Sequence, residues 1–87
     1  MRVAVCDDEK GAILFLSELL KKNELIDVVN QFANQQEFLN QIRNGEQFDI
    51  VFMDIDWKDE IDGIQLSKIL YDLSPMTQII YVTGFKS

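Results

Sequence analysis

Four short apolar runs alternate with three amphipathic stretches along the chain. The runs are rich in β-branched and aromatic residues, which is typical of strands. In the stretches between them, apolar residues recur every three or four positions, which predicts helices. The predicted strands are residues 2–6, 25–32, 48–53 and 77–82, and the predicted helices cover residues 9–22, 38–44 and 64–73.

The order of the predicted elements is βαβαβαβ, with short connections. Alternation of this kind predicts a parallel sheet with right-handed crossovers and helices on both faces. The third predicted strand is almost continuously apolar, as is typical of a strand covered on both faces. With 87 residues and no internal repeat or linker, the chain is predicted to form one α/β domain, residues 1–87.

Charge and composition narrow the functional classes. The net charge of −7 argues against direct nucleic-acid binding by this segment, because such binding rests on Lys and Arg neutralising phosphates. No apolar run approaches the ~20 residues that span a bilayer, and no signal peptide is evident. The single cysteine, Cys6, is expected to be a small buried hydrophobe and fits a reducing compartment. We therefore expect a cytoplasmic protein without a membrane partner.

Reactive polar residues follow three of the four predicted strands. Asp7-Asp8 follow the first strand, Asp54 the third and Thr83 the fourth. These residues should converge, because ligands of parallel sheets bind beyond the carboxyl ends of the strands. Clustered carboxylates repel one another unless a cation joins them, and Mg²⁺ prefers such oxygen ligands. Asp54 is then the predicted nucleophile towards a phosphoryl group, with the Thr83 hydroxyl donating a hydrogen bond to that group.

The segments "VAVCDDE", "IVFMDID" and "IIYVTG", in this order, resemble the receiver domain of bacterial two-component response regulators. The resemblance implies a flavodoxin-like fold with strand order 2-1-3-4 and a signalling role rather than an enzymatic one. It also implies that a sensor histidine kinase phosphorylates Asp54. The implied Mg²⁺ ligands are Asp8 directly, Asp7 through water, Asp54 and the carbonyl of Asp56, and Thr83 falls on the switch position.

A longer loop after Asp54 narrows the resemblance. Gly63 lies nine residues past Asp54, and "DIDWKDEIDGIQL" is similar to the receivers of LytTR-type transcriptional regulators. The segment "NQFANQQEFLNQI" is also similar to that subfamily. This resemblance implies a DNA-binding output domain and a role in transcription regulation.

The chain also departs from the family pattern, since it ends at Ser87. The resemblance implies that the fourth helix, the lysine-bearing fifth strand and the fifth helix of a receiver lie outside it, so self-phosphorylation from a phosphodonor is expected only in the intact domain. Lys86 comes too soon after Thr83 to be the phosphoryl-contacting lysine, which is therefore absent from this chain. With its last strand as an unprotected edge, the segment is expected to form a homo-oligomer or an element-swapped dimer.

Two other functions remain open from the sequence. The "DID" at residues 54–56 resembles the first motif of haloacid-dehalogenase-type phosphatases. Lys58 stands where that motif has Thr or Val, and the motif lies on the third strand rather than near the N-terminus, which disfavours this reading. A non-catalytic interaction module is the other alternative.

Several polar and aromatic side chains also have purely structural readings. Asp8 would cap the first helix, and Asp62 would cap the third. Asp59 and Glu60 are read as a solvated loop, and Gly63 as serving backbone geometry. Trp57 is read as partly exposed and available to a partner.

Overall fold

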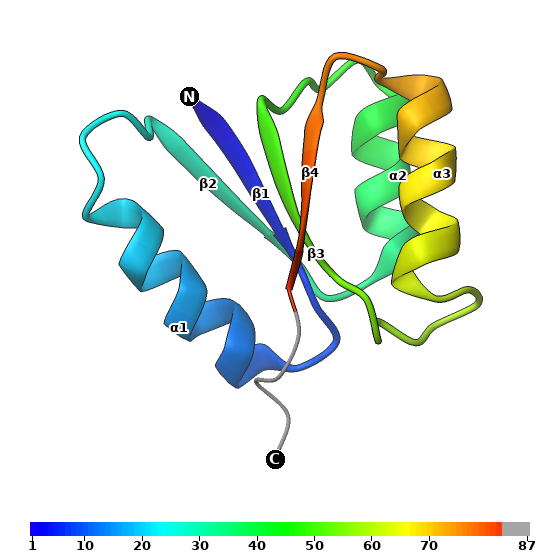
Figure 1. The fold of residues 1–87 in the computed structure, drawn as a ribbon, viewed down its shortest axis with the longest axis horizontal. Coiled ribbons are helices and arrows are strands. Elements are labelled where there is room, and N and C mark those ends of the chain that lie inside the picture. The colour runs from blue at the N-terminus through cyan, green and yellow to red at the C-terminus, as the bar shows by residue number, and fades with distance from the viewer. Residues whose placement is uncertain (83–87) are drawn as a thin grey trace.

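The computed structural model describes residues 1–82, in which four parallel strands form one twisted sheet (Figure 1). The strand order is β2-β1-β3-β4, which confirms the predicted flavodoxin-like arrangement. Thr83 and the rest of the chain lie outside the described residues. The elements are β1 (Arg2–Cys6), α1 (Lys10–Lys21), β2 (Val28–Phe32), α2 (Gln35–Arg43), β3 (Ile50–Asp54), α3 (Gly63–Leu73) and β4 (Gln78–Val82).

Helices lie on both faces of the sheet, as the alternating order predicts. Figure 1 shows α2 and α3 side by side on one face and α1 alone on the other, next to β2. The main core lies between the sheet and the α2–α3 layer, where burial of apolar side chains supplies most of the stabilisation. Its buried members are Ala4, Cys6, Phe32, Phe38, Ile42, Phe48, Val51, Met53, Trp57, Leu66 and Leu70.

Trp57 is part of this core, so the reading that left it partly exposed is wrong. The side chain is fully buried. The centre of its ring lies 6.4 Å from the centre of the Phe38 ring on α2. The loop after β3 turns inward here because the large apolar surface of the indole is stabilised by removal from water.

The second strand begins at Val28, three residues later than the sequence predicts. The segment before it forms turns instead, in which Leu25 N–H donates to Asn23 Oδ1 and Ile26 N–H donates to Asn23 O. Asparagine commonly closes such turns through its side chain. The apolar Leu25 that suggested a strand is exposed.

The helix starts depend on local caps. Asn34 caps α2, with Oδ1 accepting a hydrogen bond from Glu37 N–H, so this helix begins earlier than predicted. Asp62 caps α3 in a capping box with Gln65, which confirms the predicted role of Asp62. The predicted cap by Asp8 is wrong, because Glu9 occupies that position without a side-chain hydrogen bond.

Half of the α1 face of the sheet has no helix over it in the described part of the chain. α1 packs against β1 and β2, whereas β3 and β4 are open on this side (Figure 1). Phe52 and Ile80 are paired neighbours there. Ile80 is 43% exposed, which is unusual for a residue in the middle of a strand. An apolar strip is therefore left facing solvent.

Candidate functional site

The strand register places the predicted residues Asp7 and Asp54 together at the carboxyl ends of the two central strands. Cys6 of β1 pairs with Met53 of β3, so Asp7 and Asp54 follow at the same level on neighbouring strands. Side-chain oxygens of Asp7, Asp8 and Asp54 all lie within 4.8 Å of one another. Three carboxylates that are distant in the sequence therefore form one cluster, here called the acidic cluster.

Backbone amides hold two of these carboxylates in place. Asp56 N–H donates to Asp54 Oδ1 at 3.0 Å, and Glu9 N–H donates to Asp7 Oδ1 at 2.9 Å. Asp7 and Asp54 are buried, with 6% and 4% of their surface exposed, whereas Asp8 is exposed. The cluster thus has a fixed, buried base and one carboxylate that faces solvent.

Burial and the neighbouring carboxylates both act on the pKa of Asp7. The pKa of Asp7 is raised from its ordinary value of 3.8 to about 6. Burial is the largest cause, the charge of Asp54 and hydrogen bonds with Asp54 and Asp8 contribute in the same direction, and the hydrogen bond from Glu9 N–H acts against them. The folded chain therefore binds this proton more tightly than the unfolded chain does. Asp7 weakens the metal-free fold as pH rises between these two values, and the cost is complete above about 6.

The donor set of the acidic cluster fits a hard divalent cation. Mg²⁺ takes carboxylate oxygens and keeps several waters, so three carboxylates with one of them exposed are suitable ligands. A bound cation would also offset the repulsion that raises the pKa of Asp7. Asp56 is exposed and outside the cluster. It contributes its N–H to Asp54, and its carbonyl stays a predicted ligand.

The end of β4 lies beside the acidic cluster. Val82 is the partner of Asp54 in the sheet, and Ile55 N–H donates to Val82 O at 3.3 Å. Thr83 is the next residue in the chain and falls outside the described residues, so its switch role stays a prediction.

Gly63 lies closer to the end of β3 than the sequence indicates. A Cβ at this position would lie 2.0 Å from the Asp54 carbonyl oxygen and 3.1 Å from Ile55 Cα. Both atoms belong to the backbone, so neither can turn aside. The sequence signal for such contact is weak, since a glycine in the first turn of a helix after a loop is compatible with many structures. Only the packing shows why no side chain fits.

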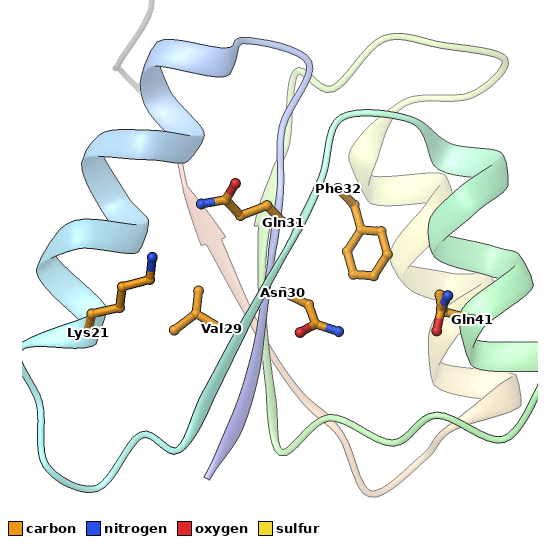
Figure 2. Close-up of a pocket in the computed structure, with 6 residues that line it drawn as sticks. All are labelled: Lys21, Val29, Asn30, Gln31, Phe32 and Gln41. Carbon is orange, nitrogen blue, oxygen red and sulfur yellow. The ribbon is translucent and has the colours of Figure 1, made fainter.

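A separate surface hollow lies at the outer edge of β2. Figure 2 shows its lining, where amide side chains from β2 and α2 surround the strand and Lys21 approaches from α1. No carboxylate lines it. Because it is open and lies at the sheet's edge rather than at the carboxyl ends of β1 and β3, we assign it no chemistry. The lining residues are Lys21, Val29, Asn30, Gln31, Phe32 and Gln41.

Comparison with known proteins identifies the family. The family model described as "Response regulator receiver domain" matches residues 3–87, which is nearly the whole chain. The chain belongs to the response regulator receiver domain family. Receiver domains act in signalling, and this favours the two-component reading over the phosphatase reading of the "DID" segment.

A curated relative of this receiver domain supports the assignment. The chain is 38% identical over 79 residues to an "Uncharacterized response regulatory protein" of Vibrio cholerae serotype O1 (strain ATCC 39315 / El Tor Inaba N16961). The alignment covers 91% of this chain and 32% of the relative. The chain therefore spans about a third of the length of the relative it matches.

Solved structures confirm the receiver fold. The N-terminal domain of a response regulator/sensory box/GGDEF 3-domain protein from Carboxydothermus hydrogenoformans superposes with a TM-score of 0.87 at 17% identity, covering all of this chain and 67% of that one. The RcsB response regulator of Salmonella typhimurium gives a TM-score of 0.85 at 22% identity, covering all of this chain and 45% of that one. At these identities the likeness concerns the fold alone.

Among the described helices, none has the length and apolarity needed to cross a membrane.

Proposed function

We propose that this receiver domain accepts a phosphoryl group on Asp54, with Mg²⁺ held by Asp7, Asp8, Asp54 and the carbonyl of Asp56. A sensor histidine kinase is the phosphodonor. The observation that carries the proposal is the acidic cluster, whose three carboxylates have oxygens within 4.8 Å of one another at the carboxyl ends of adjacent strands. Structural stability alone does not explain such a group, because like charges at this distance oppose folding.

The phosphoacceptor is prepared by its own backbone. Asp54 Oδ1 accepts the Asp56 N–H, which fixes the rotation of the carboxylate at the end of β3. A carboxylate oxygen of Asp54 attacks phosphorus, the bond from phosphorus to the donor nitrogen breaks, and the electron pair leaves with the histidine imidazole, which takes up a proton. The product is an aspartyl phosphate. A bound Mg²⁺ would supply charge compensation between the phosphoryl oxygens and the carboxylates.

The phosphorylated surface is proposed to control an output domain elsewhere in the protein. The longer loop that ends at Gly63 favours a LytTR-type, DNA-binding output, and hence transcription regulation in the cytoplasm. Contact with DNA is assigned to that output and not to this segment, whose net charge is −7. Thr83 is the proposed switch residue. The sequence that follows Ser87 in the gene tests the output assignment directly.

Trp57 provides a direct test of the metal site. The indole of Trp57 is buried, and the main-chain N–H of Trp57 donates to the Asp54 carbonyl at 3.1 Å. A shift of Asp54 is therefore expected to change the surroundings of the indole. We expect millimolar Mg²⁺ to change Trp57 fluorescence, whereas an equal ionic strength of NaCl does not. Asp8→Asn should move the response to higher Mg²⁺ concentration. A wild-type emission spectrum that is insensitive to Mg²⁺ would remove the metal from the proposal.

The same titration should depend on pH. Since a metal ligand must be deprotonated, Mg²⁺ competes with the proton on Asp7. The apparent Mg²⁺ affinity is expected to be constant above pH 7 and to fall as pH drops through about 6, the raised pKa of Asp7. An affinity that stays level down to pH 5 would argue against Asp7 as part of the site.

The 87-residue chain is further proposed to associate with itself. On the open half of the sheet Ile80 is exposed beside the half-buried Phe52, and β4 has a free edge within the described residues. A homo-oligomer or an element-swapped dimer would cover both. Sedimentation at high concentration should show species larger than the monomer, and a monodisperse monomer would contradict this.

A further inference from the structure

The loop between β3 and α3, residues 55–62, is fastened to α2 by a buried side chain. Gln35, the first residue of α2, is 4% exposed. Its Nε2 donates to Ile61 O at 2.5 Å, and Ile61 N–H donates to its Oε1 at 3.4 Å. One side-chain amide therefore pairs with both backbone groups of Ile61, as a neighbouring strand would.

The backbone of Gln35 makes a second attachment to the same loop. Gln35 N–H donates to Asp59 Oδ2 at 3.2 Å, at the positive end of α2. This contact explains why Asp59 does not join the acidic cluster, although the loop carries it close behind Asp54 in the sequence. Asp59 is thus a structural partner of α2 rather than a purely solvated side chain.

The loop so fastened carries the residues beside the phosphoacceptor. Asp56 N–H donates to Asp54 Oδ1, and Gly63 N–H donates to Ile55 O, so the two ends of the loop meet next to Asp54. Trp57 anchors its middle in the core. Ile61 is two residues from Gly63, and Gly63 bonds to Ile55, the residue before Asp56, so a contact at Ile61 has a short path to Asp56.

The negative charge of the loop explains why the side chain that holds it, here called the Gln35 clamp, is neutral. The loop contains Asp56, Asp59, Glu60 and Asp62 against a single Lys58, and it adjoins the acidic cluster. Repulsion from that cluster favours displacement of the loop. A carboxamide opposes this displacement without adding a charge, and it does not titrate.

We propose that Gln35 is a positioning residue for the acidic cluster: through Ile61 it holds the loop so that the backbone of Asp56 stays against Asp54. The expected effect of Gln35 on Mg²⁺ binding rests on the proposed function. Its effect on the hydrogen bond from Asp56 N–H to Asp54 does not depend on any metal.

The test compares Gln35→Met with Gln36→Met. Methionine keeps the length of the side chain and loses the amide, and Gln36 is an exposed neighbour whose amide bonds Asn40 on the same helix. Amide hydrogen exchange in metal-free protein measures the hold on Asp56, and calorimetric titration measures Mg²⁺ affinity. For Gln35→Met we expect faster exchange at both Ile61 and Asp56 and about tenfold weaker Mg²⁺ binding, at the lower end for residues that orient a metal ligand. Gln36→Met should match wild type.

The outcomes separate the two proposals. Faster exchange at Ile61 with unchanged exchange at Asp56 would overturn the positioning role, because Gln35 would then only stabilise the far end of the loop. A wild type that binds no Mg²⁺ would contradict the proposed function, while faster exchange at Asp56 would still support the clamp. Should Gln35→Met fail to fold, Gln35→Asn against Gln36→Asn replaces it, since asparagine keeps the amide but is one methylene shorter and loses the reach to both backbone groups of Ile61. Equal exchange at Asp56 in these two would also overturn the role.

Discussion

Replacing Asp54 by asparagine is expected to abolish phosphoryl acceptance while leaving the fold intact. Asparagine keeps an Oδ1 acceptor for the Asp56 N–H, which is 3.0 Å away, so the loop retains its hold. It lacks the negatively charged oxygen that attacks phosphorus, and it removes one of the three clustered ligands. The nucleophile and a metal ligand are thus lost in one isosteric change.

The measurement is intact mass after incubation with acetyl phosphate and Mg²⁺. It is made in a protein that carries this domain together with the lysine-bearing strand of a complete receiver. Wild type should gain one phosphoryl group and Asp54→Asn none. Asp72→Asn, which changes an exposed carboxylate on α3, is the matched control and should behave as wild type. A phosphoryl adduct of equal extent on Asp54→Asn would place the acceptor elsewhere.

The metal-free stability of the same variant gives a second result. Removing one of three clustered like charges relieves repulsion, so Asp54→Asn should melt at a higher temperature than wild type without Mg²⁺. Wild type should then gain more from added Mg²⁺ than the variant does, because ligand binding stabilises only the state that binds. A lower melting temperature for the variant in metal-free buffer would argue against electrostatic strain in the cluster.

Gly63→Ala is expected to destabilise the domain strongly and to disturb Asp54. The added methyl would lie 2.0 Å from the Asp54 carbonyl oxygen and 3.0 Å from its carbon. Since backbone atoms cannot rotate away, either α3 or the end of β3 must shift. Overpacking of this kind costs about 1–3 kcal/mol and occasionally more. We expect the upper part of that range, and weaker Mg²⁺ binding in addition.

Gly11→Ala provides the matched control for this change. Gly11 lies in α1, and a Cβ there would meet no atom within 4 Å. Alanine is the better helix former by about 0.5–1 kcal/mol, so this variant should be more stable than wild type. Urea unfolding followed by circular dichroism measures both. Equal stability of Gly63→Ala and wild type would show that the contact with Asp54 yields easily.

The acidic cluster, the loop and the core form one mechanical unit. Asp54 ends a buried strand, and its carbonyl accepts a hydrogen bond from the main-chain N–H of Trp57. The ring of Trp57 packs against Phe38 on α2. A change in charge at the cluster therefore has a short path to the α2–α3 layer. This layer is where a rearranged loop would alter the surface, as expected for a signalling switch that works through local charge.

The order of elements, the fold class and the acidic residues of the candidate site could all be predicted before any coordinates were known. Hydrophobic periodicity carries that information, because strands and helices bury different spacings of apolar residues. The strand ends carry it as well, since parallel strands end at a common edge. Asp7, Asp8 and Asp54 could be chosen on this ground without any coordinates. Errors arose where local chemistry competes with periodicity, as at the Asn23 turn before β2.

The contacts that hold the loop after Asp54 could not be predicted in this way. The burial of Trp57, the clamp of Gln35 on Ile61 and the contact of Gly63 with Asp54 join residues that periodicity cannot relate. Each depends on which surfaces meet after the chain has folded, and a polar or glycine residue in a loop is compatible with many such meetings. The physical reason is that hydrophobic pattern is a property of a single element. Close packing and hydrogen bonding between elements are properties of pairs.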